Sequence, residues 1–282
     1  MSTHSDNSAA LCVLSSSSGG NCSVLVLSCE GRRVLWLIDL GLSPRRTRVL
    51  LQQVGLADVP VGGVLLTHLD HDHMHQGWIG GLPDSWRVML HARHERRGRA
   101  MGLLTQPVDV YDDEFTLGAR IGERSRTDVR VSPAVAAHDD LGSVTFRIAT
   151  DVGDVGFVTD VGRPTQQLID HLWGVEVLAV ESNYCPQMQT ASLRPAFLKD
   201  RITSGRGHLS NQQSARMVKA ISPASDVVLL HLSRECNTPA LAQQHHAHAG
   251  LRVTVASPQE PTPLVAVRRV QTRCRVPATL WG

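Results

Sequence analysis

The hydrophobic positions of the chain occur first as short apolar runs and later as runs that alternate with helically spaced segments. Three runs rich in Val and Leu open the chain and are separated by Ser, Gly and charged residues, which is typical of strands. They cover 11–15, 23–28 and 33–39. The next segment begins with Ser43 and Pro44 and ends at Gly55. These residues are typical of helix boundaries, so we predict a helix between them.

The rest of the chain alternates predicted strands with predicted helices. Strands are predicted at 61–68, 87–92, 129–138, 143–150, 155–160, 175–182, 226–233 and 251–257. Helices are predicted at 92–102, 164–174, 194–202, 210–221 and 238–250. This order predicts an α/β fold in which two mixed β-sheets pack face to face with helices outside.

Length and composition favour one large domain. With 282 residues the chain can bury a sizeable core, and no linker, repeat or low-complexity segment divides it. We expect a flexible N-terminus at 1–10 and a single domain at 11–258. A C-terminal extension at 259–282 could add an edge strand.

Charge and cysteine usage narrow the class of protein. The formal net charge of +2 is too small to draw the whole protein to nucleic acid or membrane, so a polyanion would need a local patch. No apolar stretch approaches the roughly 20 residues that span a bilayer, and the polar start does not resemble a signal peptide. Six cysteines without a CxxC pair favour a cytoplasmic protein with free thiols.

Potential metal ligands gather where a predicted strand ends. The strand at 61–68 ends in His68, and Asp70, Asp72 and His73 follow at the spacing H-x-D-x-D-H. All four are good ligands for divalent metals. In a tight loop, alternate residues can converge on one ion while Asp72 and His73 turn to a second. A solvated polar loop with incidental histidines is the alternative interpretation.

Three more predicted strands deliver a potential ligand at or near their C-terminal ends. These ligands are His138, Asp160 and His231. A random scatter of histidines would seldom produce this placement, whereas rigid strand ends are where binding loops commonly begin. The pattern therefore favours a metal site over a polar loop.

These segments resemble the metallo-β-lactamase-fold hydrolases, and within them the YycJ/WalJ-like exonuclease branch near RNase Z and RNase J. The resemblance runs in family order from about residue 11 to residue 258. It is carried by SSSSGGNC, LIDLG, LTHLDHDH, AAHDD, GFVTDVG, ESNYCPQM, FLKDRITSGRGHLSNQQSA and LLHLSRECNTP. It implies the αβ/βα sandwich of that fold and two divalent metal ions, Zn, Mn or Fe.

The resemblance also implies which residues hold these ions. One ion would bind His68, Asp70 and His138, and the other Asp72, His73 and His231, with Asp160 bridging. Asp70 departs from the family pattern HxHxDH, which has histidine at this position. An additional anionic oxygen should favour harder ions such as Mn²⁺, Mg²⁺ or Fe²⁺ over Zn²⁺. The alternative is a weak site that loses one metal.

The implied activity is that of a metal-dependent phosphodiesterase or nuclease, with a 5′-acting DNA exonuclease as the specific expectation. Two ions can clamp a phosphoryl group and make hydroxide available by lowering the pKa of a bridging water. Asp72 would orient that water or accept its proton. By resemblance to RNase Z-like enzymes, His208 would contact the scissile phosphate or protonate the leaving oxygen. A satisfied loop histidine is the alternative for His208.

Further residues are candidates for orientation and substrate binding. Asp39 and Asp139 could orient ligands, and the helix start at Ser210 and Asn211 could hold a phosphate through its N–H groups. Arginines near the site are candidate phosphate contacts or ordinary surface residues: Arg201, Arg206 and Arg234. A second group is a candidate nucleic-acid patch or a solvated helix face: Arg93, Arg96, Arg97 and Arg99.

Two other functions remain open from the sequence. The fold hosts many substrates, so a hydrolase of a small ester, thioester, lactone or cyclic phosphodiester is one alternative. A non-catalytic metal-binding regulatory protein, with a site weakened at Asp70, is the other. The expected partner is nucleic acid, DNA before RNA, or a small phosphodiester or ester.

Overall fold

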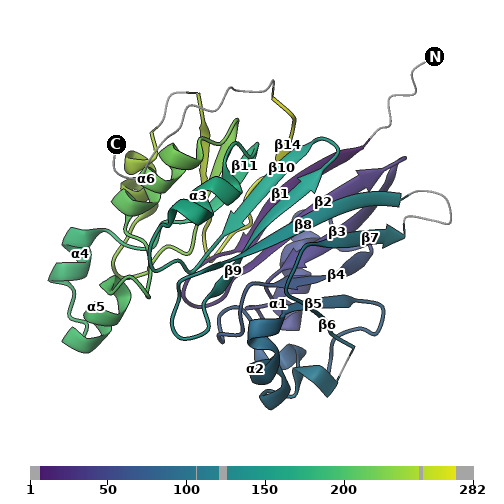
Figure 1. The fold of residues 1–282 in the computed structure, drawn as a ribbon, viewed down its shortest axis with the longest axis horizontal. Helices are drawn as coiled ribbons and strands as arrows, with labels where there is room; N and C mark the ends of the chain where they lie inside the picture. The colour runs from purple at the N-terminus through teal and green to yellow at the C-terminus, as the bar shows by residue number, and fades with distance from the viewer. Residues whose placement is uncertain (1–6, 106, 121–125, 248–249, 271–282) are drawn as a thin grey trace.

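Two mixed seven-stranded sheets form the centre of the molecule (Figure 1). The computed structural model describes residues 7–105, 107–120, 126–247 and 250–270. The first sheet has the order β14-β1-β2-β3-β4-β5-β6. Its strands are β1 (Ser8–Ser15), β2 (Cys22–Cys29), β3 (Arg32–Ile38), β4 (Val61–Leu66), β5 (Arg87–His91), β6 (Asp109–Tyr111) and β14 (Val265–Val267). Strands β3 to β6 are parallel, and the others are antiparallel to their neighbours.

The second sheet has the order β13-β12-β11-β10-β9-β8-β7. Its strands are β7 (Phe115–Arg120), β8 (Arg126–Ala136), β9 (Ser143–Thr150), β10 (Gly153–Val158), β11 (Val177–Glu181), β12 (Asp226–Leu230) and β13 (Arg252–Val255). Strands β10 to β13 run parallel, and β8 runs in the same direction because it is two antiparallel steps from β10. The carboxyl ends of β8, β10, β11 and β12 therefore meet at one edge of the sheet.

Seven α-helices surround the sheets in the described part of the chain. They are α1 (Pro44–Gln53), α2 (Glu95–Ala100), α3 (Gln166–Leu172), α4 (Pro186–Ala191), α5 (Ala196–Thr203), α6 (Asn211–Ile221) and α7 (Pro239–His245). The helix starts predicted at Ser43 and Ser210 are confirmed. Ser43 accepts a hydrogen bond from the N–H of Arg46, and Ser210 forms a capping box with Gln213.

The structure departs from the predicted boundaries at several places. Strand β1 begins at Ser8, so the expectation of a flexible segment through residue 10 is wrong for residues 8–10, and residues 1–6 lie outside the described residues. Helix α7 ends at His245 instead of reaching Gly250. Within the C-terminal extension, β14 pairs with β1 at the edge of the first sheet. Helix α4 and strands β6 and β7 were not predicted, because they are short or lack a clear apolar period.

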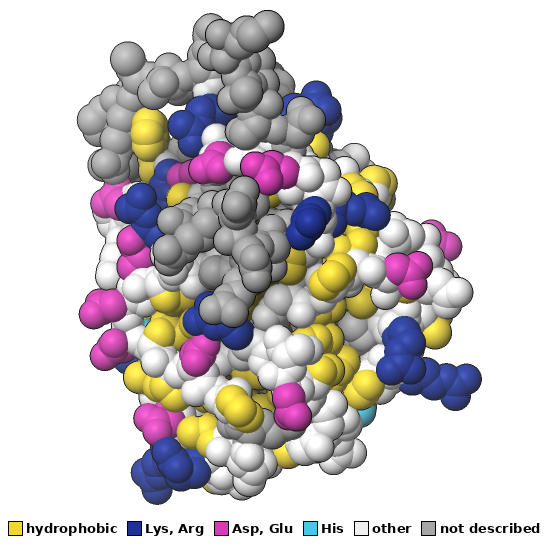
Figure 2. All heavy atoms as spheres, turned by 90° about the vertical axis from the view of Figure 1, so that its right-hand side faces the viewer, with side chains coloured by type: hydrophobic (Ala, Val, Ile, Leu, Met, Phe, Trp, Pro, Cys, Tyr) yellow, Lys and Arg dark blue, Asp and Glu magenta, His cyan; other side chains and the backbone are white. Residues whose placement is uncertain are grey.

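Among the described residues on the face drawn in Figure 2, neither positive nor negative charge dominates. There, basic and acidic side chains are interspersed with apolar and other residues. In the described residues, no helix combines the length and the apolar character that a membrane crossing requires.

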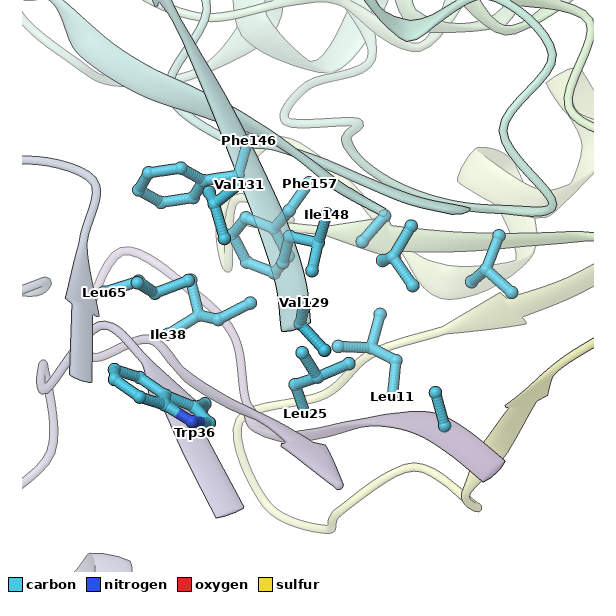
Figure 3. Packing of buried hydrophobic residues seen from close by; sticks show 14 of the residues in the cluster. Leu11, Leu25, Trp36, Ile38, Leu65, Val129, Val131, Phe146, Ile148 and Phe157 are labelled. Atoms are coloured by element: carbon cyan, nitrogen blue, oxygen red, sulfur yellow. The ribbon is translucent and has the colours of Figure 1, made fainter. Parts of the chain in front are cut away.

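Apolar side chains fill three layers around the two sheets. Between the sheets, Trp36, Ile38 and Leu65 of the first face Val131 and Phe146 of the second (Figure 3). A second cluster lies between the first sheet and α1, and a third between the second sheet and helices α3 and α6. Burial on both faces explains why the central strands are continuous apolar runs. The predicted sandwich, two face-to-face sheets with helices outside, is confirmed.

Candidate metal centre

The predicted ligands come together at one edge of the sandwich, where strands from both sheets end. His68 follows β4 in the first sheet, while His138, Asp160 and His231 follow β8, β10 and β12 in the second. The backbones of Asp160 and His231 adopt positive φ angles of 53° and 55°. Non-glycine residues seldom adopt this conformation, and here it occurs where two strands end and the ligands meet.

The first cluster contains His68, Asp70 and His138. Their ligand atoms all lie within 4.8 Å of one another. Asp70 Oδ2 is 3.8 Å from Nε2 of His68 and 3.9 Å from Nε2 of His138. His138 donates from Nδ1 to the carbonyl of Gly207 at 3.0 Å, which leaves its Nε2 directed at the cluster. The three residues predicted for one ion are therefore in each other's reach.

The second cluster contains Asp72, His73 and His231, whose ligand atoms also lie within 4.8 Å of one another. Asp72 Oδ2 is 3.2 Å from Nε2 of His231 and 3.8 Å from Nε2 of His73. The loop is fixed from outside, because the carbonyl of Asp72 accepts a hydrogen bond from the N–H of Asn21 at 2.7 Å. A side chain at Gly41 would collide with this carbonyl, so Gly41 permits the close approach.

Asp160 lies between the two clusters. Its Oδ2 is 2.9 Å from Nε2 of His73, and its Oδ1 is 3.3 Å from Nδ1 of His231 and 3.9 Å from Nε2 of His138. One oxygen of Asp160 thus faces His138 of the first cluster. Both oxygens face histidines of the second cluster. This position fits the bridging role that the resemblance implies for Asp160.

Asp39 orients His73 from behind. His73 donates from Nδ1 to Asp39 Oδ2 at 2.7 Å, and Asp39 also accepts from the N–H of Thr67 at 2.8 Å. The hydrogen bond at Nδ1 directs Nε2 toward the second cluster, where it would bind a metal once it has lost its proton. The role predicted for Asp39 therefore fits its contacts.

Glu181 was missed by the sequence analysis. It is fully buried at the end of β11, where its Oε1 accepts from Nδ1 of His208 at 2.6 Å and lies 3.3 Å from Nδ1 of His231. Its Oε2 accepts from the N–H groups of Val161 and Leu209. The signal that could have found Glu181 is the strand-end rule already used for His138, Asp160 and His231.

The site contains several buried carboxylates whose negative charge must be neutralised. Four carboxylates are buried here: Asp39, Asp72, Asp160 and Glu181. Within the described residues, their ion pairs are with histidines and not with Lys or Arg. Burial alone would raise the pKa of Asp160, but His231 and His73 outweigh it and hold this pKa well below its ordinary value. Buried anions without a fixed positive charge must be neutralised by protons or by metal ions.

The histidines divide into neutral and protonated groups. Burial and the neighbouring His73 lower the pKa of His68 well below its ordinary value, so His68 is neutral. Burial would also lower the pKa of His231, but Asp160, Asp72 and Glu181 raise it to about 10. For His73, Asp160 and Asp39 likewise outweigh burial and raise the pKa. Protonated imidazoles thus take the place of cations among the carboxylates.

One atom tests whether the residues fit a metal. Nε2 of His68 is buried and has no hydrogen-bond partner in the structure. A buried polar atom without a partner is costly and rare in folded proteins. Because the imidazole is neutral and its Nε2 faces Asp70 and His138, a divalent ion would satisfy it. The mixed set of imidazole and carboxylate ligands is suited to divalent transition metals.

A cavity of about 620 Å³ opens over the clusters. Its walls include Asp72, Asp160, His208 and His231, together with residues before and within the first turn of α5: Leu193, Arg194, Pro195 and Leu198. His208 is 20% exposed, and its Nδ1 is held by Glu181, so Nε2 is the ring nitrogen left for a bound molecule. The cavity therefore gives a substrate access to both clusters and to His208.

The structure overturns the predicted roles of Ser210 and Asn211. Ser210 caps α6, and its N–H donates to Gln213. Asn211 is fully buried and bonds to Ser182 and Asn237, while its N–H donates to the carbonyl of Tyr184. These groups are not available to a phosphate. A serine before a helix signals a cap, but it does not show whether the helix start is open.

Other predicted residues divide between the site and the surrounding structure. Asp139 Oδ2 lies 4.0 Å from Nε2 of His138, which is beyond hydrogen-bond distance, and Asp139 pairs with Arg201, while the hydrogen bond that holds His138 is the one to Gly207. Arg206 and Arg234 are exposed beside residues that line the cavity, and Arg234 donates to Ser17. In the arginine group, Arg97 pairs with Asp70, Arg99 with Glu95, and Arg93 donates to the carbonyl of Leu141. Three of its four members are thus engaged within the protein.

Comparisons with known proteins agree with this geometry. The family model of the metallo-beta-lactamase superfamily matches residues 18–208. Exodeoxyribonuclease YycJ of Bacillus anthracis is 26% identical over 234 residues, which cover 82% of this chain and 85% of the relative. Exodeoxyribonuclease WalJ of Streptococcus pneumoniae serotype 2 is 26% identical over 267 residues, or 90% of this chain and 97% of the relative.

A solved structure shows the same fold. The metallo-beta-lactamase fold protein YhfI of Bacillus subtilis aligns with a TM-score of 0.65 and 15% sequence identity, covering 90% of this chain and 99% of that one. The family model covers more than half of the chain, and it includes the loop of His68 to His73 together with His138 and Asp160. The chain therefore belongs to the metallo-beta-lactamase superfamily.

Proposed function

We propose that this protein is a metal-dependent phosphodiesterase that acts on nucleic acid, specifically a 5′-acting DNA exonuclease with two divalent ions. His68, Asp70 and His138 would hold one ion and Asp72, His73 and His231 would hold the other, and Asp160 lies between the two clusters. The observation that carries the proposal is the meeting of these two clusters at Asp160 on the floor of an open cavity.

The ions supply a Lewis acid and a water of lowered pKa when bound. The chain's own residues provide orientation and proton transfer. Burial alone would raise the pKa of Asp72, but the hydrogen bond from His231 and the charge of His73 lower it. The carboxylate of Asp72 is therefore ionised at neutral pH and can accept a proton from an attacking water.

In this proposal His208 acts on the leaving group. Glu181 accepts the hydrogen of Nδ1, so the ring is fixed by one nitrogen and presents the other to the cavity. From this position the protonated ring of His208 can donate its Nε2 hydrogen to a non-bridging phosphate oxygen or to the leaving oxygen, which leaves the ring neutral with its remaining hydrogen on Nδ1. The ring centroid of His208 lies 5.3 Å from that of His138 and 5.0 Å from that of His231, which places it between the two clusters.

The choice of DNA rests on the two curated relatives, both named as exodeoxyribonucleases and both matched over more than four fifths of this chain. The test is cleavage of 5′-labelled single- and double-stranded DNA and RNA by metal-depleted protein to which Mn²⁺, Zn²⁺ or Mg²⁺ is returned. We expect release of labelled mononucleotides from DNA by the wild type, and a loss of at least about 100-fold in Asp72→Ala. Equal cleavage by Asp72→Ala, or cleavage of RNA alone, would contradict the proposal.

One observation favours a second candidate, hydrolysis of a small phosphodiester. Several arginines around the site are paired with carboxylates, such as Arg194 with Glu235 and Arg201 with Asp139. Paired arginines offer less charge to a long polyanion. Turnover of bis(p-nitrophenyl) phosphate without cleavage of any labelled nucleic acid would favour this candidate over the exonuclease.

A further inference from the structure

Asp70, which stands where the family pattern has histidine, is paired with an arginine. Nη1 of Arg97 lies 2.6 Å from Oδ1 of Asp70, while Oδ2 of the same carboxylate faces His68 and His138. The two oxygens of Asp70 therefore have separate partners. Only Oδ2 belongs to the first cluster, so Asp70 offers that cluster a single ligand atom, as a histidine would.

The packing of α2 holds Arg97 in this place. A Cβ atom at Gly98, the next residue, would lie 2.8 Å from Cδ1 of Leu104 and 3.0 Å from Cδ2 of Leu90. The helix thus lies tightly against β5 and against Leu69, the residue between His68 and Asp70. The side chains of Asp70 and Arg97 are 23% and 42% exposed. Both line a second cavity, also of about 620 Å³, whose walls include His68 and His138. The pair consequently borders the proposed ion site directly.

We infer that Arg97 is a positioning residue that converts Asp70 into a neutral substitute for histidine. A carboxylate in place of a histidine adds one negative charge to the ligands of the first ion, and the guanidinium of Arg97 offsets that charge. The pair as a unit carries no net charge, like the imidazole that it replaces. This inference rests on the proposed metal centre but not on the choice of nuclease substrate.

The charge of Arg97 should make histidine, the residue of the family pattern, unfavourable at position 70. Asp70→His would restore the HxHxDH pattern but would leave the charge of Arg97 unpaired beside a divalent ion. We expect Asp70→His to weaken metal binding about tenfold or more, because a unit charge a few ångströms away acts strongly even in a partly exposed site. Adding Arg97→Gln to Asp70→His should recover most of the loss.

The single variant Arg97→Gln tests the charge separately. The amide of Gln is neutral and shorter than the guanidinium, so the carboxylate of Asp70 is no longer compensated. We expect Mn²⁺ to bind several-fold more tightly, since an uncompensated carboxylate favours hard cations. Arg96→Gln is the matched control, because Arg96 is exposed on the same helix and its substitution should leave metal binding unchanged.

The experiment measures dissociation constants for Zn²⁺ and Mn²⁺ by calorimetry on metal-depleted wild type and the four variants, with thermal melting as the check of folding. Binding by Asp70→His that equals the wild type, or a double variant no better than Asp70→His, would overturn the inference. If Asp70→His does not fold, unchanged Mn²⁺ binding by Arg97→Gln would overturn it instead. If the wild type binds neither ion, the proposed function fails together with the inference. If the wild type binds metal but the variants behave as described above, only the inference fails.

Discussion

Nδ1 of His208 donates a hydrogen bond of 2.6 Å to Oε1 of Glu181, a carboxylate that is fully buried. The same oxygen lies 3.3 Å from Nδ1 of His231. One glutamate thus fixes the ring that faces the cavity and a ring of the second cluster. Burial alone would raise the pKa of Glu181, but His208 and the hydrogen bonds from both histidines lower it, so Glu181 stays anionic.

Glu181→Gln should therefore lower activity through His208. The neutral amide is a weaker acceptor for Nδ1, and we expect kcat to fall about 10- to 100-fold with little change in KM. Steady-state kinetics on the preferred substrate measure this split. Glu176→Gln is the control. Glu176 directly precedes the first residue of β11, at the end of the strand away from the clusters, and it accepts a hydrogen bond from the N–H of Asp154. Full kcat in Glu181→Gln would show that this hydrogen bond does not serve catalysis.

Asp39→Asn should weaken metal binding. Asp39 accepts the hydrogen of His73 Nδ1, and loss of such a partner lowers metal affinity by roughly 10- to 100-fold. Calorimetric titration with Zn²⁺ measures the change. Asp58→Asn, at an exposed position before β4, should leave the affinity unaltered. An unchanged affinity in Asp39→Asn would mean that His73 does not need this orientation to bind metal.

The metal-free protein should lose stability as the pH rises. His231 has a pKa raised from 6.5 to about 10, and His73 is also raised, because nearby carboxylates outweigh burial. A raised pKa in the folded state stabilises the protein fully below the unfolded value. That contribution is lost as the pH rises from about 6.5 to about 10. Chemical unfolding at pH 6.5 and pH 9.5 tests this, and greater stability at the higher pH would refute it.

Metal binding should release protons for the same reason. An ion in the second cluster must displace the protons of His73 and His231, so metal affinity should rise with pH through the same window. Calorimetry at pH 7 in two buffers with different heats of ionisation counts the protons released, and we expect roughly two. A binding heat independent of the buffer would show that these imidazoles are neutral before the metal arrives.

Arg234→Ala should weaken binding of a phosphodiester without slowing its chemistry. Arg234 is exposed and donates to Ser17, beside cavity residues Ser18 and Ser233. We expect KM to rise several-fold at unchanged kcat, and the salt dependence of nucleic-acid binding to fall by about one phosphate contact. Arg33→Ala, in a residue exposed on β3, serves as the control. A variant with the wild-type salt dependence would remove Arg234 from the substrate path.

The sequence indicated the fold and the ligand clusters because both depend on local patterns. Central strands buried on two faces are apolar runs in the sequence, and Asp160 and His231 each follow such a run. Contacts between distant segments left no such pattern. The pairing of Arg97 with Asp70 depends on how α2 packs. The hydrogen bond that Asn211 donates to Asn237 depends on a buried polar cluster. Side chains of these types are equally common on open surfaces, so spacing alone could not assign them.

The most direct test of the account is the location of bound metal. Crystals of the protein loaded with Mn²⁺ or Zn²⁺ should show two anomalous-scattering peaks per chain. We predict one peak among His68, Asp70 and His138 and another among Asp72, His73 and His231, with Asp160 in contact with both. A single peak, or peaks away from these side chains, would contradict the proposed dinuclear centre.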